Sequence, residues 1–289
     1  MGSVMSSRLN GLSEIAPRYK GILSDIWGVV HNGVTPFTGA VDALTRYRES
    51  GGKVVLITNA PRPSAPIAAQ LEQLGVGRDS YDDLVTSGDI TRKMLVDSGK
   101  TKLYHLGPER DLPLYEGLGL SLVAQEEAEM ICCTGLFDDT KETPDDYDDL
   151  LKNLAKRQLP MICANPDRVV DRGNTLIYCA GSLAGRFEAY GGETMQAGKP
   201  EAAIYDAARA ALDKAAGSAI DKADILAIGD SVPTDLRGGH YQKIDALFIT
   251  SGIHAQMFGD PDAPDHERVQ HRLDHEDVET VGYMPRLIW

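Results

Sequence analysis

The chain has 289 residues, of which 42% are hydrophobic and 25% charged, as is ordinary for a globular protein. Its 29 basic and 43 acidic residues give a formal net charge of −14, which argues against nucleic acid or an anionic membrane as a partner. A phosphorylated substrate must therefore be attracted by a local cation. No apolar run approaches the roughly 20 residues that span a bilayer.

The first third of the chain alternates apolar runs with helical patterns. Residues 21–25 predict a buried strand that ends at Asp25, and residues 53–58 predict a second that ends at Thr58. Helices are expected at residues 39–50 and, after the lead-in at residues 61–64, through residue 74, followed by a strand at 84–87 and a helix that ends near residue 98. This alternation is typical of an α/β fold with a doubly wound parallel sheet.

Residues 100–193 have a different pattern and predict an inserted α/β domain. Short strands are expected at 102–106, 130–134, 160–164 and 175–179. A helix is expected at 144–157, because acids open it and bases close it, as the helix dipole favours. We therefore predict one domain made of residues 1–99 and 194–289, interrupted by a second domain at 100–193.

The first domain resumes with an Ala-rich helix from residue 200 to about 214 and strands at 224–230 and 243–250. The tail, residues 260–277, is rich in His and Asp but lacks fixed ligand spacing, so we expect a solvated helix rather than a metal site. Four cysteines lie in apolar runs, also without metal-ligand spacing: Cys132, Cys133, Cys163 and Cys179. We expect reduced core thiols, which fit a cytoplasmic protein.

Polar side chains stand at the ends of the predicted strands, where open α/β sheets bind ligands. Asp25 is a candidate nucleophile, because a carboxylate can attack phosphorus and form an aspartyl-phosphate. Thr58 can donate its hydroxyl to a phosphoryl oxygen. Each residue alone is more typical of a turn or a cap, but together with the polar residues downstream they favour phosphoryl transfer.

Lys199, Asp230 and Asp235 are the downstream members of this set. Pro200 predicts the first turn of a helix, which puts Lys199 at the cap, where lysine is a poor capping residue. A cation directed at a phosphoryl group would explain its presence. Asp230 and Asp235 share one short loop and repel each other unless a cation lies between them, and hard oxygen ligands suit Mg²⁺. A solvated acidic loop is the alternative.

These motifs resemble the haloacid dehalogenase superfamily, and within it the subfamily IIA sugar-phosphatase and nitrophenylphosphatase-like members, which carry an α/β cap. The resemblance rests on Asp25-Ile-Trp-Gly-Val-Val, Leu56-Ile-Thr58-Asn59, Ala164-Asn-Pro-Asp167, Gly198-Lys199-Pro200 and Gly229-Asp-Ser-Val-Pro-Thr-Asp235. It implies a Rossmann-like core with an inserted cap that closes over the site. It also implies a Mg²⁺-dependent phosphatase or phosphotransferase that acts on a small phosphorylated metabolite, and a homodimer, since family members often pair through the cap.

The resemblance assigns a role to each motif residue. Asp25 is the nucleophile and a metal ligand, and the other metal ligands are Asp230, Asp235 and the backbone carbonyl of Trp27. The transferred phosphoryl group is held by Thr58, Asn59 and Lys199. Candidates for contacting the leaving group are Arg62, Asn165 and Asp167, although loop residues of these types also serve turns.

Trp27 departs from the family pattern. Phosphatases of this superfamily usually carry a second Asp at that position as general acid and base, a role typically worth about 10²–10⁴-fold in rate. Three accounts follow: the substrate has a good leaving group, a neighbour such as His31 or a cap residue replaces the acid, or the enzyme is weak or inactive. A non-catalytic phosphometabolite-binding protein is thus one alternative. A dehalogenase is a weaker one, because halide-releasing members generally lack the paired acids of Asp230 and Asp235.

Overall fold

The computed structural model describes residues 6–173 and 175–289, which form two compact units. The core unit comprises residues 6–58, 68–85 and 205–289. The inserted unit comprises residues 59–67 and 86–204. It therefore contains the predicted insertion, residues 100–193, together with helix α3 (Ser87–Asp97) and short flanking segments.

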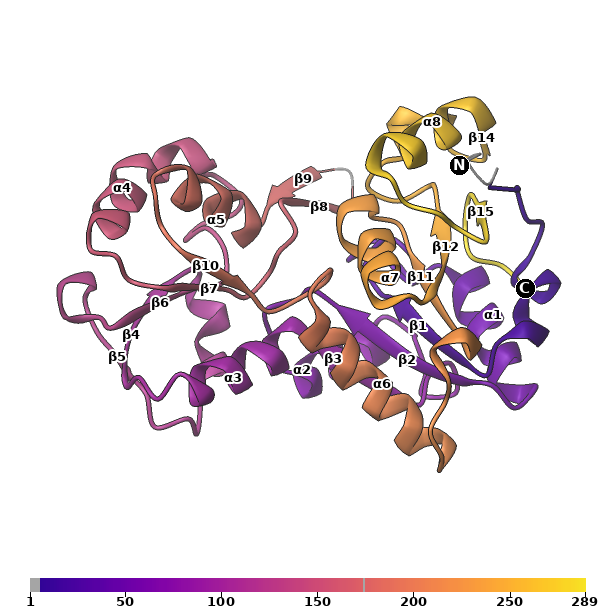
Figure 1. Cartoon of the computed structure of the whole chain (residues 1–289), viewed down its shortest axis with the longest axis horizontal. Helices are drawn as coiled ribbons and strands as arrows, with labels where there is room; N and C mark the ends of the chain where they lie inside the picture. Colours follow the sequence, from indigo (N-terminus) through magenta and orange to yellow (C-terminus); the bar gives the residue numbers. More distant parts are fainter. Residues whose placement is uncertain (1–5, 174) are drawn as a thin grey trace. The chain divides into compact units, whose positions relative to one another are not determined.

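A six-stranded sheet lies at the centre of the core unit, in the order β15-β12-β11-β1-β2-β3. Its strands are β1 (Gly21–Asp25), β2 (Lys53–Thr58), β3 (Asp83–Thr86), β11 (Ile225–Gly229), β12 (Asp245–Ile249) and β15 (Gly282–Met284). Strand β1 pairs in parallel with both β2 and β11, which Figure 1 shows on its two sides. Every residue of β1 and of β11 is buried, as expected for parallel strands that are covered on both faces.

The strand order reverses beside β1. The chain proceeds from β1 through β2 to β3 on one side of the sheet, and it returns through β11 and β12 on the other side. Ligands of open α/β sheets bind at the carboxyl ends of the strands at such a reversal. The doubly wound parallel sheet predicted from the sequence is thus confirmed, and its reversal lies between β1 and β11.

Helices follow the strands of this sheet, and the sequence predicted each of them except the one at residues 237–242. They are α1 (Thr38–Glu49), α2 (Ser64–Gln73), α6 (Ala202–Ala216), α7 (Arg237–Gln242) and α8 (His266–Glu276). In α1 the buried residues recur with helical spacing (Ala40, Ala43, Leu44 and Tyr47), so one face packs inward. Among the described residues, no helix has the length and apolar character needed to cross a membrane.

The tail differs in part from the prediction. Residues 266–276 do form a helix, α8, but its residues Val269 and Leu273 are buried, so the helix is amphipathic rather than solvated all round. A short hairpin, β13 (Gly259–Asp260) and β14 (Ala263–Pro264), precedes it. Strand β15 follows it and joins the central sheet, which the sequence analysis missed because three residues are too few for a periodic signal.

The inserted unit has a five-stranded parallel sheet in the order β10-β7-β6-β4-β5. Its strands are β4 (Lys102–Leu106), β5 (Ser121–Leu122), β6 (Met130–Cys133), β7 (Met161–Cys163) and β10 (Thr194–Gln196), with helices α4 (Asp148–Lys156) and α5 (Ala180–Ala189). A separate antiparallel hairpin joins β8 (Val169–Arg172) to β9 (Thr175–Tyr178). The helix predicted at 144–157 is a 3₁₀ turn, Pro144–Tyr147, followed by α4.

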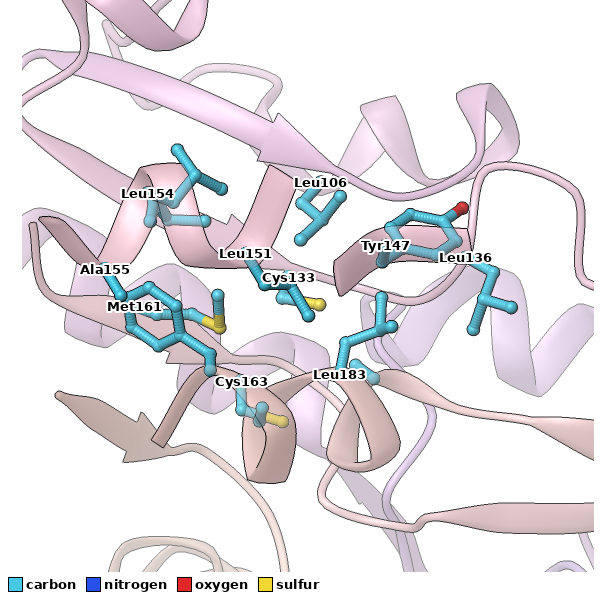
Figure 2. Packing of buried hydrophobic residues seen from close by; sticks show 14 residues of the cluster. Leu106, Cys133, Leu136, Tyr147, Leu151, Leu154, Ala155, Met161, Cys163 and Leu183 are labelled. Atoms are coloured by element: carbon cyan, nitrogen blue, oxygen red, sulfur yellow. The ribbon is translucent and has the colours of Figure 1, made fainter. Parts of the chain in front are cut away.

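This unit has its own hydrophobic core (Figure 2). Leu151 and Leu154 of α4 and Leu183 of α5 pack with Cys133 and Met161 from the sheet, all of them fully buried. The four cysteines of the chain are buried free thiols, as predicted. Burial raises the pKa of the Cys163 thiol to about 12, so this side chain packs as a neutral, apolar group.

Candidate active site

Two strand ends meet at the reversal of the core sheet. Strand β1 ends at Asp25 and β11 ends at Gly229, and the pairing of Ser24 with Ile228 brings Asp25 level with Gly229, next to Asp230. The loop after β11 continues into a single π-helical turn, Val232–Leu236, which contains Asp235. Such turns are rare and occur frequently at functional sites.

Asp25, Asp230 and Asp235 form a cluster of carboxylates. One oxygen of each lies within 4.8 Å of the other two, and the three residues are 5%, 5% and 4% exposed. Three carboxylates so close and so buried repel one another unless positive charge lies near them. A hard divalent cation, which prefers carboxylate oxygens, fits this donor set. The predicted spacing of the acids thus brings three of the expected metal ligands together.

Two glycines leave room for the Asp230 carboxylate. A Cβ on Gly28 would lie 2.2 Å from Asp230 Oδ2, and one on Gly252 would lie 1.9 Å from the same atom. The backbone N–H of Ile253 donates a hydrogen bond to Asp230 Oδ2 at 2.7 Å. The loop after β12 therefore helps to position Asp230, a role that the sequence analysis missed. The polar run Thr250-Ser-Gly252 after an apolar strand was the signal that could have found it.

The Asp235 carboxylate is held in a similar way. A Cβ on Gly229 would lie 2.1 Å from Asp235 Cγ, so only glycine at the end of β11 permits this approach. The backbone N–H of Ser231 donates to Asp235 Oδ2 at 3.1 Å. Hydrogen bonds from backbone N–H groups stabilise the charged form of a carboxylate, and they keep Asp235 turned toward the other two acids.

Trp27 packs against the loop that follows β1. Its indole meets the His31 ring edge-on, with the ring centroids 5.1 Å apart. A Cβ on Gly33 would lie 2.5 Å from indole atoms Cη2 and Cζ2. His31 is only 3% exposed, and its Nδ1 accepts a hydrogen bond from the backbone N–H of Gly33 at 2.9 Å. Burial lowers the pKa of His31 to about 4, so its ring is neutral at pH 7.

Thr58 lies at the carboxyl end of β2, on the other side of β1. The pairing of Asp25 with Ile57 brings Thr58 one residue beyond the level of the Asp25 carboxylate. It is 6% exposed. The core unit thus holds Asp25, Thr58, Asp230 and Asp235 at the ends of three neighbouring strands, as the sequence predicted for that end of the sheet.

The predicted site residues of the inserted unit form a hydrogen-bond network. Asn59 Oδ1 accepts from the backbone N–H of Lys199 at 2.8 Å, and Asn59 Nδ2 donates to Asp167 Oδ1 at 2.9 Å. Asn165 Oδ1 in turn accepts from the backbone N–H of Asp167 at 3.1 Å. Gly198 permits this packing, because a Cβ there would lie 2.3 Å from Asn59 Oδ1. Asn59 therefore links the end of β2 to two distant loops.

The expected position of Lys199 at a helix cap is wrong. Residues 199 and 200 lie in a turn, and α6 begins only at Ala202. The backbone N–H of Glu201 donates to the Gly198 carbonyl, which closes this turn before the helix. Lys199 is 2% exposed, so a residue type that almost always lies at the surface is buried here. Its burial, rather than poor capping, is what makes it unusual.

Arg62 lies in the same unit among charged side chains. Burial lowers the pKa of its guanidinium, and the charge of Asp111 opposes that effect. Asp111 is 3% exposed, and burial raises the pKa of its carboxyl. The neighbouring Asp139 accepts hydrogen bonds from Arg110 at 2.6 Å and Arg172 at 3.0 Å. The sequence analysis missed these charged neighbours, because they come from segments far apart in the chain.

Comparison with known proteins identifies matching families. Residues 22–121 match the family described as haloacid dehalogenase-like hydrolase, and residues 196–275 match a second HAD-hydrolase-like family. A solved haloacid dehalogenase-like hydrolase from Brucella suis is 42% identical, covers 97% of this chain and 100% of its own, and has a TM-score of 0.88.

Two further relatives are more distant. The D-glycerol 3-phosphate phosphatase of Mycobacterium tuberculosis is 25% identical over 288 residues, which is 96% of this chain and 77% of the relative. A solved structure described as a possible sugar phosphatase, from Cytophaga hutchinsonii, is 20% identical with a TM-score of 0.77, over 96% of this chain and 97% of its own. The latter likeness is one of fold.

Proposed function

We infer that this chain, which belongs to the haloacid dehalogenase-like hydrolases, is a Mg²⁺-dependent phosphatase of small phosphorylated metabolites. The observation that carries this proposal is the cluster of three buried carboxylates at the reversal of the core sheet. When bound there, Mg²⁺ would neutralise charge on the transferred phosphoryl group. The two more distant relatives are named as a phosphatase of D-glycerol 3-phosphate and a possible sugar phosphatase, which supports a phosphatase activity.

Asp25 is the proposed nucleophile. One of its oxygens forms a bond to phosphorus, the bond from phosphorus to the leaving oxygen breaks, and an aspartyl-phosphate results. Water then attacks the phosphorus, the bond from phosphorus to Asp25 breaks, and inorganic phosphate leaves while solvent takes the proton. Asp230 and Asp235, with the backbone carbonyl of Trp27, are the proposed metal ligands beside Asp25.

Electrostatic stabilisation supplies most of the catalysis in phosphoryl transfer. We propose that the Thr58 hydroxyl, the Asn59 amide and the Lys199 ammonium hold the phosphoryl oxygens. The buried position of Lys199 and its backbone hydrogen bond to Asn59 support this role, because they restrict where the ammonium group can lie. Arg62, Asn165 and Asp167 stay candidates for contacting the leaving group.

Phosphate release from a panel of acyl, aryl and alkyl phosphates tests the proposal. Release is expected in Mg²⁺, and it should be lost in EDTA and in Asp25→Asn. Asp42→Asn is the matched control, since Asp42 is an exposed residue of α1 that pairs with Arg46 one turn along the same helix. Release that persists in EDTA and in Asp25→Asn would contradict the proposal.

The same assay separates the alternatives. Binding of phosphate esters without release, in the parent protein and in Asp25→Asn alike, would identify a phosphometabolite-binding protein. Halide release from haloacids that persists in EDTA would identify a dehalogenase. The carboxylate cluster favours a metal-dependent site, which the phosphatase needs and the dehalogenase does not.

A further inference from the structure

We infer that the substrates of this protein are phosphates with a weakly basic leaving group, namely acyl, enol or aryl phosphates. This inference rests on the proposed function, and it narrows the substrate class of that same site. It follows from what the structure places around Asp25, and in particular from the residues that could give a proton to the leaving oxygen.

The loop after β1 carries no carboxyl group. From Ile26 to Val41 the sequence contains no Asp or Glu. Its bulkiest side chain, Trp27, has an indole N–H, which is not an acid. The indole is also fixed in place, because it packs against Gly33 so tightly that a Cβ there would lie 2.5 Å from two of its atoms. Trp27, two residues after the proposed nucleophile, therefore occupies space without supplying a proton.

His31 is the one imidazole of that loop, and its surroundings remove it from the reaction. It is 3% exposed, its ring lies edge-on to Trp27, and its Nδ1 is engaged by the N–H of Gly33. A general acid must come within hydrogen-bond reach of the leaving oxygen. A ring that is buried and packed edge-on against the indole cannot do so without opening the loop.

The loops after β11 and β12 offer no substitute among the described residues. In the loop after β11, Asp230 and Asp235 belong to the carboxylate cluster. In the loop after β12, residues 250–259, His254 is the one titratable side chain. Its charged neighbours are Arg272 and Glu276, both on helix α8. Both acids of the loop after β11 thus belong to the cluster, and residues 250–259 contain no Asp or Glu.

Asp167 is the one acid among the proposed leaving-group contacts, and its Oδ1 accepts a hydrogen bond from Asn59 Nδ2 at 2.9 Å, as an ionised carboxylate does. Without a proton donor, the leaving oxygen departs as an anion. Attack by Asp25 forms the new bond to phosphorus, and the electron pair of the broken bond stays on the leaving oxygen, which later takes a proton from solvent. An alkoxide is a poor anion, because alcohols are about as weakly acidic as water, whose pKa is about 15.7. A phenol has a pKa of about 10 and a carboxylic acid about 4, so aryl and acyl phosphates can react this way.

The test is the dependence of kcat/KM on the leaving group. Acetyl phosphate and p-nitrophenyl phosphate should exceed glycerol 3-phosphate by at least about 10²-fold, the lower value of a general acid. Phenyl phosphate should be hydrolysed more slowly than p-nitrophenyl phosphate. Equal values for the alkyl and the aryl ester would overturn the inference and leave the proposed function intact. If none of these four compounds released phosphate, the proposed function itself would be refuted.

Substitution of Trp27 provides the second measurement. Trp27→Asp places a carboxyl group at the indole position and should narrow the gap between aryl and alkyl esters by about tenfold or more. Trp27→Phe, which keeps an aromatic ring without an acid, is the matched control and should keep the gap. An unchanged gap in a folded Trp27→Asp protein would count against the inference. If that variant does not fold, the leaving-group series in the parent protein decides alone.

Discussion

Alanine substitution of Gly28 and Gly252 tests whether the Asp230 carboxylate must lie where the structure shows it. A Cβ at either position would come within 2.2 Å of Asp230 Oδ2. Ordinary contacts between non-bonded atoms are about 3.5 Å, so the carboxylate would have to move by more than about 1 Å in either variant. A displacement of that size can cost about 10²-fold in rate.

The two glycines differ in backbone conformation, which permits a matched design. Gly28 has a φ of +89°, where a side chain costs about 1–2 kcal/mol, whereas Gly252 lies outside this left-handed region. Gly75 has a φ of +84° and no atom within 4 Å of its Cβ position. Gly75→Ala therefore introduces backbone strain without a clash. Gly252→Ala introduces the clash with Asp230 without that strain, and Gly28→Ala introduces both.

We expect Gly75→Ala to lower the melting temperature by a few degrees and to keep its phosphatase activity. Gly28→Ala and Gly252→Ala should each lose about 10²-fold in kcat/KM. They should also lose the rise in melting temperature that Mg²⁺ produces in the parent protein by binding only the folded state. Activity within threefold of the parent in both site variants would refute the reasoning, because Asp230 would then tolerate displacement.

Three further outcomes can be measured. Asn59→Asp should lower the free energy of unfolding in urea by about 1–3 kcal/mol, because it replaces the amide donor to Asp167 with a second carboxylate. The control Asn153→Ala, at an exposed position of α4, should have little effect. Leu151→Ala should cost about 2–5 kcal/mol, since Leu151 is fully buried in the core of the inserted unit; a loss below about 1 kcal/mol would mean that this core repacks freely. Burial lowers the pKa of His105, so the unfolded chain binds the proton more readily, and stability should fall as pH drops below about 6.5. His105→Gln should weaken that dependence in thermal unfolding between pH 7 and 5, and an identical pH profile in the variant would assign the acid sensitivity to other groups.

Much of the fold could be predicted from the sequence because its signals are local. The residues of β1, β2 and β11 are apolar runs that end in polar residues, and each was expected within two residues of where the structure has it. The helix α1 follows from the spacing of its apolar residues. The acids of the candidate site were found for the same reason, since the carboxyl ends of parallel strands meet at one edge of a sheet.

Other features depend on residues far apart in the chain. The hydrogen bond between Lys199 and Asn59 joins positions 140 residues apart, and no local pattern encodes it. A turn closed by the hydrogen bond from the Glu201 N–H to the Gly198 carbonyl precedes α6, which begins at Ala202. Pro200 therefore lies in this turn and not in the first turn of the helix, so the predicted cap was wrong. The position of Lys199 was thus decided by packing within the inserted unit.

The sequence by itself determined which residue types stand at the strand ends, because burial patterns and short loops depend on residues that are adjacent in the chain. Only the tertiary structure decided the order of the strands, the close approach of Gly28 and Gly252 to Asp230, and the burial of His31 beside Trp27. The physical reason is that these features depend on how segments far apart in the chain pack against one another. Such packing involves the whole unit, so no short stretch of sequence predicts it.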